Sequence, residues 1–267
     1  MKLTLEERLL LKLAKPEGAP PLGATDNYSL DNCLQFPRKT IPDFDALIRG
    51  KKVLDYGCGP GWQAVAMRTQ CGADSVFGLD INPQWLAHGR RLAEQSGADR
   101  VQFGSVVPPE LVGTFDLVLS ISAFEHFDNP AQELARMRSL VRPGGHVEIT
   151  WAEPWFSPYG SHFADWARIP GTRMSIPWMN LLFSERALLT LRSRFRQDRP
   201  RRFEDIEGGL NKMTVAKFER ILKESGMVVE ELRLYATKKL PLVTRLPVLR
   251  ELLTSAAACR LRNAKAS

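Results

Sequence analysis

An α/β fold with a mostly parallel sheet is predicted by two patterns in this chain of 267 residues. Between residues 50 and 153, short apolar stretches alternate with helical stretches. That order is typical of βαβ units, in which helices cover both faces of a parallel sheet. The first apolar stretch leads into VLDYGCGPG (53–61), which has three glycines in its last five positions. A glycine turn between a strand and a helix presents backbone N–H groups to a ligand.

We expect seven strands, five before and two after a less regular stretch at 154–211. The runs that predict them are KVLDY (52–56), SVFGLD (75–80), RVQFG (100–104), FDLVLSIS (115–122), HVEITWAE (146–153), MVVEELRLYA (227–236) and SAAACRLRN (255–263). Helical patterns separate them at 62–70, 83–97, 130–141 and 214–226. Asn82 before Pro83, and Thr214 before an apolar-periodic run, are typical helix N-caps.

Four segments divide the chain. Residues 1–49 are expected to form an N-terminal helical lid, and residues 50–153 a sheet core that carries the glycine turn and binds its ligand. The stretch 154–211, rich in Pro, Trp and Arg, is expected to be a substrate cap inserted after the fifth strand. It would lie over the strand ends where such sheets bind ligands. Residues 212–267 return to the core and include a basic amphipathic segment.

The composition argues against several classes of protein. No apolar run approaches the ~20 residues of a membrane span, and MKLTLEERLLLKLAK mixes acids into its apolar residues, unlike a signal peptide. The net charge is +7, much of it after residue 190, which indicates a solvated basic surface or an acidic partner. A reducing, cytoplasmic location is favoured over a disulfide framework or a zinc site, because no CxxC pair occurs among Cys33, Cys58, Cys71 and Cys259.

Two acids indicate the kind of ligand. Asp55 ends the first strand directly before the glycine turn, where a carboxylate would repel a pyrophosphate but attract an ammonium group. Asp80 ends the second strand, within GLDINP, where a carboxylate accepts hydrogen bonds from both hydroxyls of a ribose. An amino group, a ribose and a closely approaching backbone describe S-adenosylmethionine (SAM) better than NAD.

On these residues the chain resembles the class I SAM-dependent methyltransferases, in particular their type 11-like small-molecule members. Asp55–Gly61 matches the first family motif, Asp80 the acidic second-strand motif, FDLVLSISAFEHF the fourth-strand motif and VRPGG the motif before the fifth strand. The resemblance implies a Rossmann-like sheet with SAM as the cofactor. Ser105 stands where many relatives carry an aspartate that meets the adenine amino group. The implied SAM-binding positions are Asp55, Gly57, Cys58, Gly59, Gly61, Asp80, Ile81, Ser105 and Ser122.

The segment SAFEHF follows the fourth strand and is expected where the methyl group emerges. Glu125 and His126 are the catalytic candidates, because an imidazole titrates near neutral pH and can take a proton from a hydroxyl. Some relatives, including plant small-RNA 3′-end and ubiquinone-biosynthesis methyltransferases, bind a divalent metal here with E-x-x-E-H. This chain has S-x-x-E-H, with His162 as a further candidate ligand. Three alternatives follow: a metal on Glu125, His126 and His162, a metal-free base at His126, or a purely structural pair.

The cap is expected to hold the acceptor. Trp155, Tyr159, His162 and Trp178 can wall a pocket for a ring-shaped molecule such as a sugar, a polyketide or a phenol; alternatively, the rings form the cap's own core. The expected reaction is methyl transfer to a hydroxyl of a small molecule or glycan. N- or C-methylation of a natural product is an alternative. An RNA-binding methyltransferase is a weaker one, because RQDRPRRFED mixes acids with its arginines and offers few aromatic rings for stacking bases.

Leucines recur at helical spacing within 241–258, at Leu242, Leu246, Leu249 and Leu253. Arg245 and Arg250 lie between them, so the pattern predicts an amphipathic helix. Such a helix more often packs on its own domain, and otherwise makes a peripheral contact with a membrane surface.

Overall fold

A mixed sheet of seven strands organises the described part of the chain. The computed structural model describes residues 3–15, 28–163, 166–172, 174–196, 199–206, 209–237 and 246–264. The strand order is β3-β2-β1-β4-β5-β7-β6, and every neighbouring pair is parallel except the two that β7 makes. The predicted α/β class is confirmed. The strands are β1 Lys52–Tyr56, β2 Ser75–Leu79, β3 Val101–Gly104, β4 Phe115–Ile121, β5 Val141–Ala152, β6 Val228–Ala236 and β7 Thr254–Arg262.

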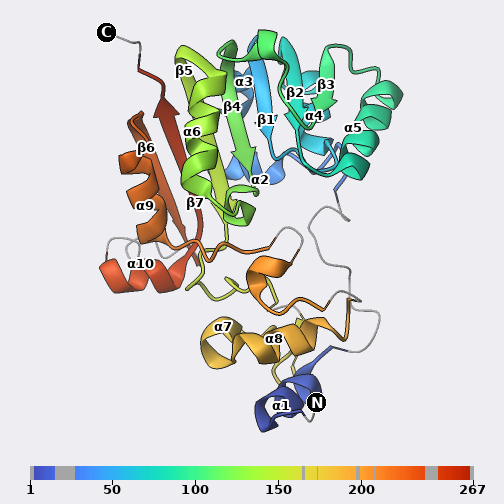
Figure 1. Ribbon diagram of the computed structural model, residues 1–267, viewed down its shortest axis with the longest axis vertical. Coiled ribbons are helices and arrows are strands. Elements are labelled where there is room, and N and C mark those ends of the chain that lie inside the picture. The colour runs from blue at the N-terminus through green and yellow to red at the C-terminus, as the bar shows by residue number, and fades with distance from the viewer. Residues whose placement is uncertain are drawn as a thin grey trace.

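Helices cover both faces of the sheet, because adjacent residues of a strand point to opposite sides. In β1, Leu54 packs in the hydrophobic cluster under α6 and α9, whereas Val53 packs in the cluster on the other face, under α3, α4 and α5. Figure 1 shows α6 in front of the strands. The helices are α2 Gln35–Thr40, α3 Phe44–Ile48, α4 Trp62–Thr69, α5 Pro83–Gln95, α6 Pro130–Leu140 and α9 Val215–Glu224.

Both predicted N-caps are confirmed. The side chain of Asn82 accepts hydrogen bonds from the backbone N–H groups of Gln84 and Trp85, with Pro83 in the first helical turn of α5. The Thr214 hydroxyl accepts from the N–H of Lys217 at the start of α9. These caps satisfy donors that have no partner within the helix.

A smaller body lies beyond the carboxyl ends of the parallel strands (Figure 1). It contains α1 (Leu5–Leu13), α7 (Met179–Leu182) and α8 (Glu185–Arg192), and it has its own hydrophobic cluster. Leu10 of α1 is fully buried in this cluster with Met179 and Leu188. In contrast, α2 and α3 pack beside the sheet, so the two described parts of the predicted lid at 1–49 join different clusters.

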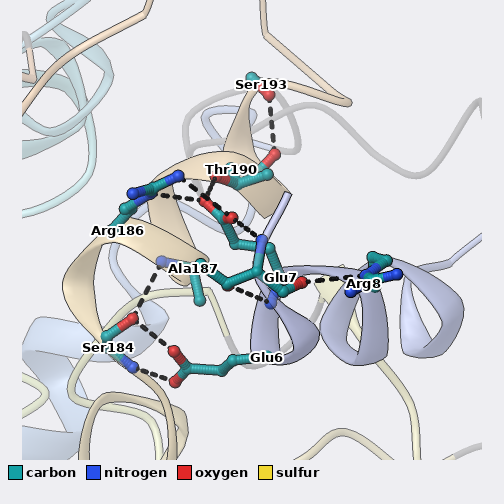
Figure 2. A network of polar contacts seen from close by, with 9 residues as sticks. Glu6, Glu7, Arg8, Ser184, Arg186, Ala187, Thr190 and Ser193 are labelled. Atoms are coloured by element: carbon teal, nitrogen blue, oxygen red, sulfur yellow. Dashed lines mark hydrogen bonds and ion pairs between the residues drawn. The ribbon is translucent and has the colours of Figure 1, made fainter. Parts of the chain in front are cut away.

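Two acids of α1 bind α8, as Figure 2 shows. The buried carboxylate of Glu7 accepts hydrogen bonds from Arg186 at 2.8 Å and from the Thr190 hydroxyl at 2.9 Å. Glu6 accepts from the backbone N–H and the hydroxyl of Ser184. A hydrogen bond from the Thr4 backbone, together with those from Thr190 and Arg186, lowers the pKa of Glu7 to about 2. The N-terminal helix is therefore part of the same body as α7 and α8, and this body is called the cap from here on.

The expected amphipathic segment at 241–258 is corrected in part. Its first residues, 241–245, with Leu242 and Arg245, lie outside the described residues. The helix α10 spans Pro247–Leu253 and leaves Val248 71% exposed. Residues 254–258, however, belong to β7 and lie between β5 and β6, because their small side chains fit an inner strand. None of the described helices is long and apolar enough to cross a membrane.

Candidate functional site

The ends of β1, β2, β3 and β4 bring the predicted cofactor residues to one edge of the sheet. β2 and β3 lie on one side of β1, and β4 lies on the other. The chain reverses its direction across the sheet at this point, which is where open α/β sheets bind ligands. Gly57, Asp80, Ser105 and Ser122 each follow one of these strands directly, so the fold gathers them at this edge.

The glycine turn presents its backbone to this edge. Gly57 and Gly61 have φ angles of 81° and 86°, which L side chains rarely adopt. A Cβ on Gly57 would lie 2.7 Å from the Cβ of Ala123, and one on Gly61 would lie 2.8 Å from the Cα of Gly89. At Gly59 the nearest atom to such a Cβ is 3.9 Å away. The turn therefore has no room for side chains at its ends and is least crowded at its middle.

Asp55 and Cys58 are buried beneath the turn. Asp55 is 0% exposed, and neither of its carboxylate oxygens has a hydrogen-bond partner in the described part of the chain. This burial, with the nearby charge of Asp80, raises the pKa of Asp55 to about 7. A cationic group beside Asp55 would satisfy both oxygens and favour the ionised form. The Cys58 thiol is also buried, and this burial raises its pKa, so the thiol is neutral near pH 7.

Asp80 is oriented by two backbone N–H groups. Its Oδ2 accepts from Gly59 at 2.8 Å, and its Oδ1 accepts from Asn82 at 2.9 Å. Each oxygen keeps a lone pair for a further hydrogen bond, so the carboxylate suits a ligand with two adjacent hydroxyls. Ile81 is 92% exposed beside it, an apolar surface that a planar ring would cover. Ser105 and Ser122 are also exposed, at the ends of β3 and β4.

His126 belongs to a short turn, η3 (Phe124–His126), that follows β4. Its Nδ1 lies 3.2 Å from the carbonyl oxygen of Gly209. Because a carbonyl only accepts hydrogen bonds, this contact assigns the proton of the neutral ring to Nδ1. Nε2 then keeps its lone pair, so it is the atom able to take a proton from another group.

His162 reaches His126 from the cap. The two rings stand edge to face, with 5.6 Å between their centroids. Burial, followed by the charge of His126, lowers the pKa of His162 to about 3, so its ring is neutral near pH 7. The Nε2 of His162 is buried and has no hydrogen-bond partner among the described residues.

The predicted metal-ligand set of Glu125, His126 and His162 is not assembled. Among the described residues, no three side chains of His, Cys, Asp or Glu are placed to hold a metal ion. Glu125 is 4% exposed, and its Oε1 lies 3.5 Å from the backbone nitrogen of Ala152 in β5. Burial raises the pKa of Glu125. The carboxylate of Glu125 is buried beside β5, whereas the ring of His126 contacts the Gly209 carbonyl and the ring of His162.

The predicted acceptor residues differ in exposure. Trp155 packs edge to face on Phe203, with 5.3 Å between the centroids, within the cap's hydrophobic cluster. Trp178 is half-buried, and its indole nitrogen has no hydrogen-bond partner in the described chain. Tyr159 is 39% exposed, and its carbonyl accepts from the N–H of His162 at 2.8 Å. Trp155 therefore stabilises the cap, and Tyr159 offers a ring on its surface.

Sequence patterns did not single out Gly209 and Asn211, which hold the loop that carries His126. The Asn211 Nδ2 donates to the carbonyl oxygens of Phe124 at 2.9 Å and Phe127 at 2.8 Å. Its backbone N–H donates to the carbonyl of Glu125 at 3.0 Å. The separation between Asn211 and Phe127 is 84 residues, so no local pattern indicates this contact.

Comparison with known proteins identifies the family of this chain. A family model described as "Methyltransferase domain" matches residues 35–232. A ubiquinone biosynthesis O-methyltransferase of Acinetobacter baumannii is 38% identical over 104 residues, which are 38% of this chain and 43% of that protein. A ribosomal protein L11 methyltransferase of Burkholderia vietnamiensis is 34% identical over 119 residues, 44% of this chain and 35% of that protein. The chain spans less than half the length of these relatives.

Solved structures share the fold at low identity. A SAM-dependent methyltransferase from Mesorhizobium loti has a TM-score of 0.55 and 22% identity, over 88% of this chain and 100% of that chain. The [4+2]-cyclase SpnF has a TM-score of 0.53 and 14% identity, over 89% of this chain and 80% of that chain. Since SpnF is named a cyclase, the fold alone does not determine the reaction. The family match covers most of the chain, and this chain therefore belongs to the methyltransferase domain family.

Proposed function

We propose that this methyltransferase acts on a hydroxyl group of a small molecule or glycan, with His126 as the general base. The observation that carries the proposal is the contact of 3.2 Å between His126 Nδ1 and the Gly209 carbonyl. It leaves Nε2 as a proton acceptor next to the strand ends. A hydroxyl has a pKa far above neutral, and a positioned base contributes about 10²–10⁴-fold to the rate by removing its proton.

In this proposal the residues at the strand ends bind SAM. Its sulfonium charge activates the methyl group that is transferred. Asp55 would pair with the amino group, because its two buried oxygens lack partners among the described residues. Asp80 would accept the ribose hydroxyls, since Gly59 and Asn82 already hold it in place. The backbone of the glycine turn, with Ile81, Ser105 and Ser122, would line the rest of the cofactor.

Glu125 and His162 would support His126 rather than complete a metal site. The neutral ring of His162 packs against His126 and limits its rotation. The Glu125 carboxylate would connect this loop to the sheet, because its Oε1 lies 3.5 Å from the backbone nitrogen of Ala152 in β5. The donor set therefore favours a metal-free base, and the proton of the acceptor hydroxyl would pass to Nε2 of His126.

The cap favours a ring-shaped acceptor. Tyr159 offers an exposed ring, while His162 and Trp178 offer buried nitrogen atoms that lack protein partners in the described chain. An O-methyltransferase among the relatives supports oxygen as the acceptor atom. Another relative is named a ribosomal protein L11 methyltransferase, so an acceptor that is methylated on nitrogen or carbon is the second candidate.

A labelling experiment tests the proposal. The enzyme is incubated with hydroxyl-rich small-molecule extracts and SAM that carries a trideuterated methyl group, and mass spectrometry identifies the labelled products. We expect methyl ethers. In His126→Ala we expect turnover to fall by about 10²–10⁴-fold with SAM still bound, whereas His146→Ala, at the other end of the sheet, should be active. Label on nitrogen or carbon would overturn the hydroxyl acceptor, and normal turnover in His126→Ala would overturn the base.

A further inference from the structure

We propose that Asn211 is a positioning residue, which holds His126 in the tautomer that can act as a base. The inference concerns two segments that lie side by side. The loop at 124–127 follows β4 and carries His126, and the strap at 209–213 returns from the cap to the sheet. The consequence for catalysis rests on the proposed role of His126, whereas the positioning role rests on the contacts of Asn211 and on the contact between Gly209 and His126.

Asn211 joins the strap to the loop by three hydrogen bonds. Its side-chain Nδ2 donates to the carbonyls of Phe124 and Phe127, at 2.9 and 2.8 Å, and its backbone N–H donates to the carbonyl of Glu125 at 3.0 Å. These acceptors stand on both sides of His126. Two residues before Asn211, the Gly209 carbonyl accepts from Nδ1 of His126. The bonds of Asn211 therefore fix the distance at which Gly209 meets the imidazole.

An amide is the side chain that this position requires. One nitrogen with two N–H groups serves two carbonyl oxygens at the same time. An aspartate of the same size would place carboxylate oxygens against those carbonyls, and an alanine would leave both carbonyls without this donor. Either change should loosen the loop from the strap.

The strap is also anchored in the cap. The carbonyl of Met213 accepts from the N–H of Trp155 at 2.7 Å. Lys212 forms ion pairs with Glu185 of α8 at 3.1 Å and with Glu204 at 2.9 Å. Asn211 thus lies between the body that is proposed to bind the acceptor and the loop that is proposed to remove its proton. Loss of its bonds should free His126 to adopt the other tautomer, in which Nε2 carries the proton and cannot accept one.

Nitrogen NMR of the imidazoles tests this inference without any acceptor. The chain has four histidines, and His126→Ala identifies the signals of His126 in the full-length protein. In the wild type we expect His126 to be protonated at Nδ1 when neutral. In Asn211→Ala we expect the Nε2-protonated form to become the major one. Turnover should fall by about 10- to 100-fold, since small losses of alignment have effects of this size.

Asn263 provides a matched control. Its Nδ2 also donates to backbone carbonyls, including that of Val141 at 3.1 Å, but at the opposite end of β5. Asn263→Ala should leave the His126 tautomer unchanged. Should Asn211→Ala fail to fold, Asn211→Asp gives the same readout. An unchanged tautomer in the Asn211 variants would overturn the proposal, and so would failure of both to fold while Asn263→Ala folds.

The outcomes separate this inference from the proposed function. A tautomer shift in Asn211→Ala together with normal turnover in His126→Ala would support positioning by Asn211 and overturn the role of His126 as a base. A slow His126→Ala enzyme together with an unchanged tautomer in Asn211→Ala would support the base and overturn the positioning role.

Discussion

The sheet core and the cap each bury a carboxylate, and the two carboxylates have opposite surroundings. In the core, Asp55 has no hydrogen-bond partner in the described chain, and its pKa is raised to about 7. In the cap, Glu7 is bound by Thr4, Arg186 and Thr190, and its pKa is lowered to about 2. Partners from the protein offset the cost of burying a charge, whereas a buried charge without partners is costly until a ligand supplies them.

The core and the cap also differ in how far apart in the sequence their contacting segments lie. Core strands pair with parallel neighbours that follow one another in βαβ units. The cap joins α1 to α8, and the bond between Arg186 and Glu7 spans 179 residues. We therefore expect changes in the core to act on the cofactor, and changes in the cap to act on the acceptor.

The largest effect is expected from Trp155→Ala, which tests whether the cap is independent of the core. Trp155 packs on Phe203 inside the cap, so its removal should cost about 3 kcal/mol of the cap's unfolding free energy. The dissociation constant for SAM should stay within about twofold, since the candidate cofactor residues lie in the core.

Thermal unfolding measures the change in stability, and calorimetry measures the dissociation constant for SAM. Tyr159→Ala, at an exposed ring, is the control and should change stability by less than about 0.5 kcal/mol. A parallel loss of SAM binding in Trp155→Ala would contradict this independence.

Asp55→Asn should weaken SAM binding and stabilise the free protein. Loss of a charge-assisted contact should cost on the order of 2 kcal/mol in binding, or about 30-fold. The pKa of Asp55 is raised in the folded protein, so the native state binds a proton more tightly than the unfolded state. This carboxyl therefore makes the wild type lose stability as the pH rises from about 4 to about 7.

The amide that replaces the carboxyl in Asp55→Asn does not titrate, so the variant should lack that part of the pH dependence. Urea unfolding at pH 5 and pH 8, without SAM, checks the sign. A wild type and variant with the same slope between these values would show that Asp55 is not the group responsible.

The smallest effect is expected from Glu7→Gln, in the docking of α1. The pKa of Glu7 is lowered in the folded protein, so its contribution to stability is complete above the ordinary value of 4.5 and is lost as the pH falls toward about 2. Amide hydrogen exchange of α1 should be faster in Glu7→Gln than in the wild type at pH 6, and the difference should shrink in acid. Glu224→Gln, which removes an exposed acid at the end of α9, is the control and should leave the exchange of α1 unchanged. Equal exchange of α1 in wild type and Glu7→Gln at pH 6 would contradict the role of Glu7.

The sequence by itself determined the core. Apolar strands in a βαβ order predict a parallel sheet, and the carboxyl ends of its strands necessarily share one edge. The glycine turn, Asp55 and Asp80 could be assigned to that edge because each directly follows or ends a predicted strand. Asn82 and Thr214 could be identified as N-caps for the same reason, since a cap is recognised within one helical turn.

Only the tertiary structure decided how the cap and the loop that carries His126 are arranged. The sequence placed Glu125, His126 and His162 in one candidate metal set, but Glu125 is buried beside β5, and the three side chains are not placed to hold a metal ion. It predicted a strand at 255–263, which β7 confirms, but it also extended the amphipathic segment to residue 258, into the same strand. The bonds of Gly209 and Asn211 to the loop join residues more than 80 positions apart. Contacts over such separations depend on how whole elements pack together, and local periodicity carries no information about them.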